Sequence, residues 1–193
     1  HIYDEIDSTN AEAKRVEDIK DFHIFIAEKQ TNGRGRHGKK WSSPNTGNIY
    51  MTISTSQNAS QISPISLIFG LICKKAIDKL IRKPSIMLKW PNDIYLNREK
   101  LAGVLVELDG QPQGPCQLVI GIGINLHMPE SVSQHIDQAW TDLSQHVQGL
   151  DKNKLVAYLC FYLEKRLAQY QQSGLNDMYL QWNQLNAFAG ECV

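Results

Sequence analysis

The stretch that decides the fold reads Gly33-Arg34-Gly35-Arg36-His37-Gly38-Lys39-Lys40-Trp41. It holds four arginine or lysine side chains, one histidine and three glycines within nine positions. Apolar runs at residues 23–29 and 48–55 flank it, so the pattern predicts a strand, a basic glycine loop and a second strand. Glycines permit positive φ angles and close backbone approach, and arginines offer planar donors for carboxylate or phosphate oxygens. The loop therefore predicts a site for an anionic small molecule or a phosphate group.

The three glycines of this loop also match the formal spacing of a dinucleotide-binding fingerprint. That fingerprint needs a helix that opens at the third glycine. Residues 39–47 instead contain two serines, a proline, an asparagine and a glycine, which is loop chemistry. On the loop alone, a solvated basic hairpin tip or a nucleic-acid-binding patch stays open beside the anion site.

The composition limits the class of protein. The chain has 193 residues, enough for one large domain or two small ones, and 42% of them are hydrophobic. Lys plus Arg equals Asp plus Glu at 20 each, and this balance argues against a general nucleic-acid binder. No apolar stretch is long enough to span a membrane, no signal peptide opens the chain, and neither cysteines nor histidines show metal-ligand spacing. We expect a cytoplasmic protein with free thiols at the four widely spaced cysteines: Cys73, Cys116, Cys160 and Cys192.

The rest of the chain predicts a mixture of strands and helices. Strands are expected at residues 2–6, 23–28, 48–55, 86–90, 93–96, 100–108 and 117–126. Helices are expected at residues 11–19, 62–81, 154–172 and 175–185, and a polar loop at 128–148. This order predicts an α+β fold, with a mixed, largely antiparallel sheet packed with helices.

Several positions carry two interpretations. Ser8 or Thr9 is a natural N-cap for the first helix, but a hydroxyl at a strand-to-helix junction can also donate to a ligand. Lys89 ends an apolar strand, where a lysine is unfavourable unless its charge is used or the strand lies at a sheet edge. Gly121 and Gly123 share one face of a strand, which leaves room for a flat group or marks a bulge or twist point.

Five motifs together carry a family resemblance. They are the basic glycine loop, Ser8-Thr9-Asn10, KWPND at 89–93, KLAGVLVE at 100–107 and GIGIN at 121–125. In this order and spacing the chain resembles the biotin protein ligases (biotin–[acetyl-CoA-carboxylase] ligases). The resemblance implies a class II aminoacyl-tRNA synthetase/biotin ligase-like fold, with residues 1–190 as the catalytic domain. It also implies that biotin and ATP react to biotinyl-5′-AMP and pyrophosphate, and that biotin then passes to a lysine of a biotin carboxyl carrier protein.

The resemblance also implies a role for each matching residue. Lys89, Arg36 and Arg34 would be catalytic, with Lys89 on the biotin carboxylate and the α-phosphate and Arg36 on the pyrophosphate side. Contacts to biotin are implied for Ser8, Thr9, Asn10, Gln30, Gly33, Arg34, Arg36, Trp41, Lys89, Gly103 and Gly121. Contacts to ATP or the adenylate are implied for Arg34, Arg36, Lys89, Lys100, Asn125 and Trp140. Ordinary core packing is the alternative for both tryptophans.

Other expectations follow from the resemblance and from departures from it. Mg²⁺ is expected with ATP, although no metal ligands are identified, and a homodimer is compatible with the family. His37 and Lys39 stand where arginine is usual in the family. The chain ends at Val193, about where family members begin a C-terminal β-barrel, and no DNA-binding segment precedes His1. A lipoate or octanoate ligase or transferase of the same fold is the alternative, but those enzymes have a different glycine loop.

Overall fold

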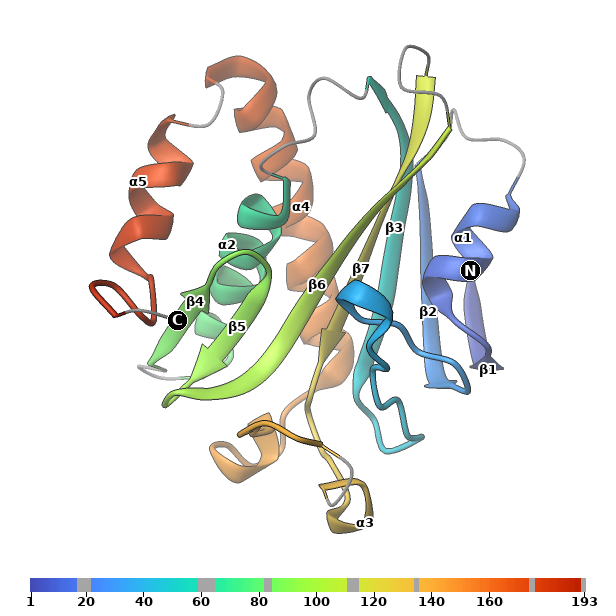
Figure 1. The fold of residues 1–193 in the computed structure, drawn as a ribbon, viewed down its shortest axis with the longest axis vertical. Helices are drawn as coiled ribbons and strands as arrows, with labels where there is room; N and C mark the ends of the chain where they lie inside the picture. The colour runs from blue at the N-terminus through green and yellow to red at the C-terminus, as the bar shows by residue number, and fades with distance from the viewer. Residues whose placement is uncertain are drawn as a thin grey trace.

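The central sheet has its strands in the order β1-β2-β3-β7-β6-β5-β4 (Figure 1). The computed structural model describes residues 1–16, 22–58, 65–81, 85–110, 115–133, 136–173 and 176–191. β1 and β2 pair in parallel, and every following pair of neighbours is antiparallel. The predicted mixed, largely antiparallel sheet is thus confirmed. The strands are β1 (Ile2–Ile6), β2 (His23–Gln30), β3 (Ile49–Asn58), β4 (Ile86–Lys89), β5 (Asp93–Leu96), β6 (Glu99–Gly110) and β7 (Pro115–Ile124).

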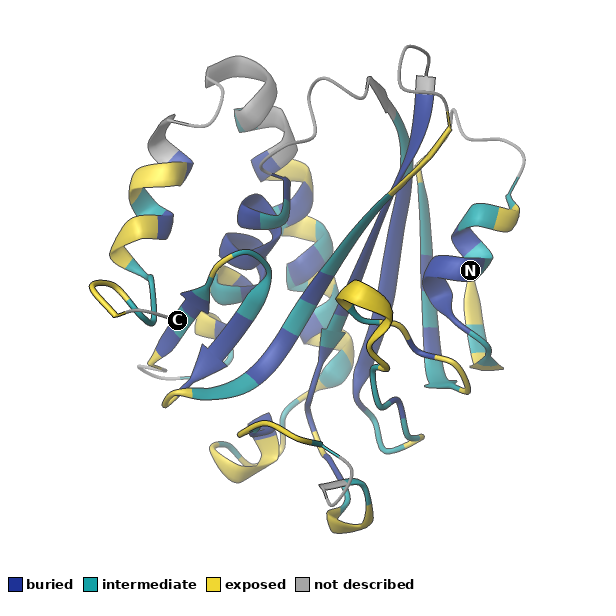
Figure 2. Ribbon diagram, in the orientation of Figure 1, coloured by how far each residue is buried: buried dark blue, intermediate teal, exposed yellow. Residues whose placement is uncertain are grey.

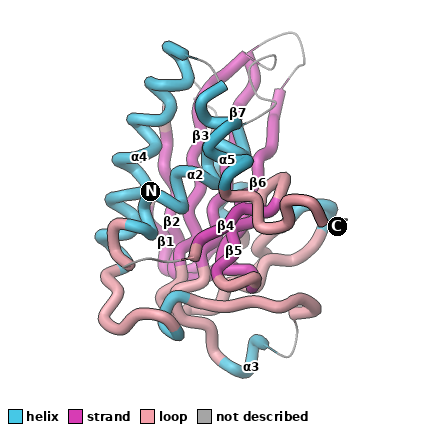
Figure 3. The backbone as a smooth tube through the Cα atoms, turned by 90° about the vertical axis from the view of Figure 1, so that its left-hand side faces the viewer, coloured by secondary structure: helices cyan, strands magenta, loops and turns pink. Residues whose placement is uncertain are grey.

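Helices cover both faces of this sheet. Helix α2 packs against α4, α5 and strands β4 to β6, whereas α1 contacts β2, β3 and β7. Figures 1 and 3 show α2, α4 and α5 grouped together on one side and the loops around α3 gathered at the lower end. The helices are α1 (Thr9–Arg15), α2 (Ile65–Asp78), α3 (Glu130–Ser133), α4 (Lys152–Ser173) and α5 (Asn176–Gln184), with short 3₁₀ turns η1 (Arg36–Gly38) and η3 (Leu143–Gln145).

Alternation along β7 explains how the two faces differ. Ile120, Ile122 and Ile124 point into the main core beneath α2, because successive strand residues face opposite sides. The residues between them are Gly121 and Gly123, which have no side chains and leave room on the opposite face for the side chains of Asn10 and Trp41. Figure 2 shows the central strands buried, with the exposed turn η1 in front of them. One face of the sheet therefore packs against the main core, and the first cavity lies on the opposite face, beside the start of α1.

The first helix begins as expected but ends earlier. Ser8 is its N-cap, and the Ser8 hydroxyl accepts a hydrogen bond from the Ala11 amide. The helix stops at Arg15 rather than reaching residue 19, because Val16 is extended and packs against the small cluster around Phe25. Residues 17–19 lie outside the described part of the chain. The second predicted helix is α2, which is followed by a turn after Asp78, and residues 62–64 of that prediction also lie outside the described part.

The polar segment at 128–148 is more ordered than the predicted loop. It contains α3, η3 and a parallel bridge between Lys100 and Trp140. The buried Asp142 organises it, since its carboxylate accepts hydrogen bonds from the amides of Met128 and Gln145. Apart from these short elements, the described part of the segment is irregular, as the sequence predicted. The buried hydrogen bonds of Asp142 could not be foreseen, because a buried polar acceptor has the same sequence pattern as a solvated loop residue.

Strands β4 and β5 form a hairpin that brings Lys89 opposite Asp93. β4 lies at the end of the named strands of the sheet, which is one of the two settings in which a strand lysine was expected. The turn into β6 passes through Asn97 and Arg98, both with positive φ, and it joins the strands that were predicted at 93–96 and 100–108.

Candidate active site

The floor of the site is a patch of small side chains on the open face of the sheet. In the register of β6, β7 and β3, Gly103 lies opposite Gly123, and Gly121 lies opposite Thr52. A Cβ atom on Gly123 would lie 2.5 Å from Cε2 of Trp41, and one on Gly103 would lie 3.1 Å from Cζ3 of the same ring. The glycines therefore allow the indole of Trp41 to lie flat on the sheet. The flat group that the glycine spacing predicted is, in this structure, a side chain of the protein itself.

Trp41 separates two neighbouring cavities and lines both of them. The glycine loop that carries it passes in front of β6 and β7 (Figure 1). The loop is anchored by the Trp41 amide, which donates to the Gly33 carbonyl at 2.9 Å. Among the described side chains, the indole Nε1 of Trp41 is the buried nitrogen or oxygen atom without a hydrogen-bond partner. A buried N–H donor without a partner is a position at which a ligand oxygen could accept a hydrogen bond.

The first cavity has a volume of about 300 Å³ and is lined by side chains from distant parts of the chain. Arg34 and Arg36 come from the glycine loop, Lys89 from β4 and Lys100 from β6. The predicted site residues that line it are Ser8, Thr9, Asn10, Gln30, Arg34, Arg36, Trp41, Lys89, Lys100, Gly103 and Gly121. Cations from three separate segments therefore face one space, as the sequence predicted.

The second cavity, of about 880 Å³, lies on the other side of Trp41. It is lined by the remaining predicted residues, Gly33, Asn125 and Trp140, and by Lys100, which faces both spaces. Lys29, Lys39 and Lys40 add positive charge, the last two lining the first cavity as well. Asp137 is the one acid among the described residues of this wall. Such a surface suits a polyanion that carries an apolar ring.

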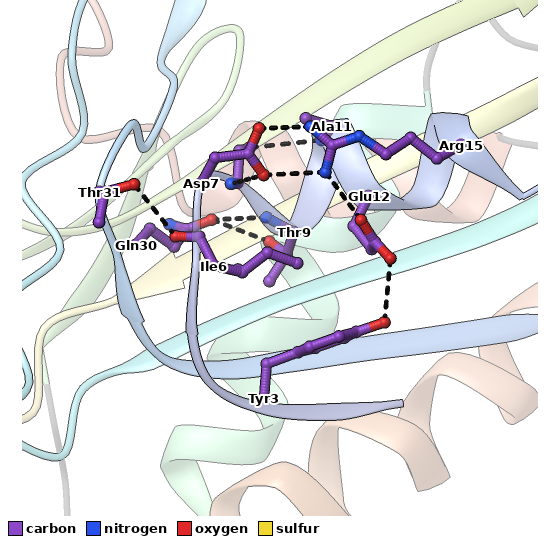
Figure 4. A network of polar contacts seen from close by, with 10 residues as sticks. Tyr3, Ile6, Asp7, Thr9, Ala11, Glu12, Arg15, Gln30 and Thr31 are labelled. Atoms are coloured by element: carbon purple, nitrogen blue, oxygen red, sulfur yellow. Dashed lines mark hydrogen bonds and ion pairs between the residues drawn. The ribbon is translucent and has the colours of Figure 1, made fainter.

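A hydrogen-bonded network lies behind the first cavity. Gln30 Oε1 accepts from the Thr9 amide at 2.9 Å and from the Thr9 hydroxyl at 3.0 Å (Figure 4). Gln30 Nε2 donates to Ser43 Oγ at 2.9 Å. The buried Thr52 hydroxyl lies 2.7 Å from Thr9 Oγ1 and 2.6 Å from Asn10 Oδ1. These bonds fix the rotamers of the predicted biotin contacts before any ligand arrives.

The network ends in a half-buried ion pair. Asn10 Nδ2 donates to Glu107 Oε2 at 2.8 Å, and Lys14 Nζ lies 2.7 Å from Glu107 Oε1. Burial by itself would raise the pKa of Glu107, but the hydrogen bonds from Lys14 and Asn10 outweigh it and hold that pKa below its ordinary value. Glu107 is thus a fixed anion that orients Asn10 over Gly121.

Arg34, Arg36, Lys89 and Lys100, the four predicted cations that line the first cavity, are held in different ways. Lys100 pairs with Asp93 at 2.9 Å, and its ammonium lies 5.5 Å from the centroid of the Trp41 ring. Arg36 donates to Asn92 Oδ1 at 3.3 Å. The Lys89 ammonium lies over the ring of Phe188. Arg34 is exposed on the loop. The pKa of Asp7 is lowered mainly by the hydrogen bond from Arg15, against the opposing effect of burial, and the Ser8 amide and the charges of Arg15 and Arg34 lower it further.

Comparison with known families agrees with this geometry. The sequence model described as "Biotin/lipoate A/B protein ligase family" matches residues 3–125, more than half of the chain. The chain belongs to the biotin/lipoate A/B protein ligase family. The match includes the glycine loop, Lys89 and Lys100, so it covers most of the segments that build the site.

Individual relatives of this ligase family are similar over most of the chain. The bifunctional ligase/repressor BirA of Escherichia coli K12 is 37% identical over 191 residues, which are 97% of this chain and 59% of the relative. The biotin–[acetyl-CoA-carboxylase] ligase of Mycobacterium tuberculosis is 34% identical over 156 residues, 78% of this chain and 56% of the relative. The chain thus spans less than two thirds of the length of these relatives.

Solved structures show the same fold. A biotin protein ligase from Aquifex aeolicus in complex with biotin and ATP superposes with a TM-score of 0.82 at 26% identity, and the match covers 97% of this chain and 78% of that protein. The biotin ligase-like fold expected from the sequence is therefore confirmed. The described residues contain no helix long and apolar enough to cross a membrane.

Several residues of this ligase site were not found from the sequence. Thr52, Ser43 and Glu107 carry the network, and Phe188 contacts Lys89. Thr52 alternates with apolar residues on β3, which could have marked it as facing the other side of the sheet from the core. Phe188 gave no such signal, because it lies far along the chain in a short segment after α5.

Proposed function

We propose that residues 1–190 are the catalytic domain of a biotin protein ligase. The domain joins biotin to ATP, forms biotinyl-5′-AMP with release of pyrophosphate, and transfers the biotinyl group to a lysine of a carrier protein. One observation carries this proposal: Arg36, Lys89 and Lys100, from three separate segments, line a single cavity. The names of the relatives and the biotin and ATP bound in the Aquifex aeolicus structure support the choice of substrates.

The first step needs these cations because both reactants are anions. The carboxylate oxygen of biotin attacks the α-phosphorus of ATP, a new P–O bond forms, and the bond to pyrophosphate breaks. At 4 Å two unit charges repel by roughly 4 kcal/mol in a site with an effective dielectric constant of about 20. A fixed ammonium or guanidinium between them reverses the sign of that interaction. Biotin supplies its own nucleophile, so the site requires positioning and charge rather than a nucleophilic side chain.

The two cavities divide the substrates between them. Biotin occupies the first, with Ser8, Thr9 and Gln30 at its ureido ring and Lys89 at its carboxylate. The Ser8 hydroxyl accepts from Ala11 at 3.4 Å, and among the described residues no acceptor takes its own proton, so it remains available to a ligand.

ATP occupies the second cavity, with its adenine near Trp140 and its sugar and α-phosphate near Asn125. Lys100 and Trp41 line both spaces, and the reacting atoms meet beside them. Among the described residues no group of three or more histidine, cysteine or acidic side chains could hold a metal ion. We expect Mg²⁺ to enter with ATP, bound to its phosphates as part of the substrate.

The second step transfers the product to a protein. A lysine amine of the acceptor attacks the biotinyl carbonyl, an amide bond forms, and AMP leaves with the electrons of the broken C–O bond. We propose the biotin carboxyl carrier protein of acetyl-CoA carboxylase as this acceptor, because the Mycobacterium tuberculosis relative is named for that enzyme. A cytoplasmic location and a homodimer belong to the same proposal.

A biotin-dependent exchange of pyrophosphate with ATP tests the first step. The wild-type protein should catalyse the exchange with biotin, and replacing Lys89 with alanine should reduce it by roughly 100- to 1,000-fold, the range seen when one charge-stabilising donor is removed. Lys74→Ala is the matched control, since Lys74 forms an exposed ion pair with Asp78 on α2 away from both cavities. If the exchange depends on lipoate or octanoate instead of biotin, the proposed substrate is wrong. If Lys89→Ala keeps the wild-type rate, the catalytic role assigned to Lys89 is wrong.

A further inference from the structure

The segment after α5 returns to the edge of the sheet beside the site. The Leu88 amide donates to the Leu185 carbonyl at 2.7 Å, and the Ala187 amide donates to the Leu88 carbonyl at 2.8 Å. Leu88 and Asn186 thus form a parallel bridge. The segment adds one short extended piece outside β4 and delivers the next residue, Phe188, to the neighbourhood of Lys89.

The ring of Phe188 is held from several sides. Its centroid lies 5.6 Å from that of Tyr95, with the two planes at 89°, which is a favourable edge-to-face geometry. The Phe188 amide donates to Asn186 Oδ1 at 3.2 Å, and its carbonyl accepts from Glu191 at 3.0 Å. Tyr95 itself lines the first cavity, so the ring is fixed against a wall of the site without lining the cavity.

The Lys89 ammonium lies 4.9 Å from the centroid of this ring, within the range of a cation–π interaction. Asp93, directly across the hairpin from Lys89, pairs with Lys100 instead. Among the described side chains no carboxylate lies within ion-pair distance of the Lys89 nitrogen, in contrast to Lys14, Lys100 and Lys152. Lys100 and Lys89 are therefore held by different means, Lys100 by an acid and Lys89 by an aromatic face.

This difference decides what each ammonium can do. A carboxylate partner neutralises a lysine and competes with an anionic substrate for it. An aromatic face attracts the ammonium through its quadrupole, fixes its position and leaves its charge in place. A substrate carboxylate or phosphate interacts with a cation more strongly than the ring does, so Lys89 can turn from the ring to the substrate at low cost.

We propose that Phe188 is a positioning residue that holds the Lys89 ammonium, charged and unneutralised, at the wall of the cavity for the carboxylate and α-phosphate of the reactants. The proposal rests on the proposed ligase function. A second cation, Arg98, lies 5.1 Å from the centroid of the same ring, but it is neutralised by Glu191 through three contacts of 2.9 to 3.2 Å. Arg98 therefore does not compete with Lys89 for the anionic substrates.

Nuclear magnetic resonance tests the contact without any substrate. In protein labelled with ¹³C at the ε-carbon of lysine, the Lys89 signal is the one that disappears in a Lys89→Arg variant. It should be displaced upfield by the ring current of Phe188 and should return to the ordinary lysine position in Phe188→Leu. Phe161→Leu is the matched control, because Lys165 lies 4.4 Å from the Phe161 ring on α4, away from the cavities. A Lys89 signal that is undisplaced, or that ignores Phe188→Leu, overturns the proposal.

The exchange assay tests the consequence. Phe188→Leu should lower the rate of biotin-dependent exchange roughly 2- to 30-fold, which is the rate change that corresponds to the free energy of one cation–π interaction. Phe188→Tyr and Phe188→Trp keep an aromatic face and should restore most of the rate, whereas a merely structural role would be served by leucine as well as by tryptophan. Phe161→Leu should leave the rate unchanged.

The two measurements separate the two hypotheses. A ring-current displacement combined with full exchange in Phe188→Leu overturns the positioning role while leaving the ligase function intact. An inactive wild-type protein overturns the ligase function and the role with it, and the spectrum then still shows whether the ring holds the ammonium. Loss of both the displacement and the rate in Phe188→Leu, with recovery in Phe188→Trp, supports the proposal.

Discussion

Replacing Gly123 with alanine should destabilise the protein and disturb both cavities together. The new Cβ would lie 2.5 to 2.8 Å from three atoms of the Trp41 indole. Packed carbon atoms approach to about 3.5–4.0 Å, so the indole must move by about 1 Å. Gly123 lies within strand β7 rather than in a left-handed turn, so its backbone adds no strain. Overpacking of this kind costs roughly 1–3 kcal/mol.

Two other glycines make this prediction quantitative. At Gly103 the added Cβ would lie 3.1 Å from the same indole, so the cost of Gly103→Ala should be smaller. In α2 the Cβ of Gly70→Ala would meet Leu88 at an ordinary 3.4 Å. That variant should gain stability, by up to about 1 kcal/mol, because alanine favours a helix over glycine.

Urea unfolding followed by circular dichroism measures all three free energies, and titration with biotin and with ATP measures both affinities. The expected order of stability is Gly70→Ala, then Gly103→Ala, then Gly123→Ala. A Gly123→Ala protein as stable as the wild type, with unchanged affinity for both ligands, would refute the placement of Trp41 on the sheet.

Three further predictions follow from the site and the core. Because the pKa of Glu107 is lowered in the folded state, its contribution to stability is complete above the ordinary carboxyl pKa and is lost as the pH falls through the lower folded value. The difference in unfolding free energy between the wild type and Glu107→Gln should therefore be largest near pH 7 and vanish in strong acid. Burial raises the pKa of the Cys73 thiol to about 12, so iodoacetamide at pH 8 should modify Cys73 only when the protein unfolds, as peptide mass mapping would show. Trypsin should cleave at the exposed Arg34 and Arg36 more slowly with biotin and ATP present, if the loop closes over the ligands; equal cleavage would contradict that closure.

Much of the fold could be predicted from local patterns. The order of strands and helices follows from apolar periodicity, and the hairpin at Asn97 and Arg98 from its turn residues. The ends of helices were harder to predict from the sequence. Val16 ends α1 and packs against the cluster with Phe25, and this contact forms only when the chain has folded.

The site was predictable where residues face the cavity and not where they support it. The glycine loop, Lys89 and Lys100 stand out because cations and glycines are unusual among apolar strands. Thr52 and Glu107 look like ordinary polar strand residues, and their function appears only when β3, β6 and β7 are placed side by side. Long-range pairing of this kind leaves no local trace in a single sequence.

The bridge between Leu88 and Asn186 has a consequence for how the protein is made. Lys89 is synthesised almost a hundred residues before the ring of Phe188 that faces it. A nascent chain on the ribosome can therefore form most of its sheet while the Lys89 ammonium still lacks that support. Under the role proposed for Phe188, translation past α5 would act as a late assembly step, and chains released before it would lack the ring that holds Lys89 in place.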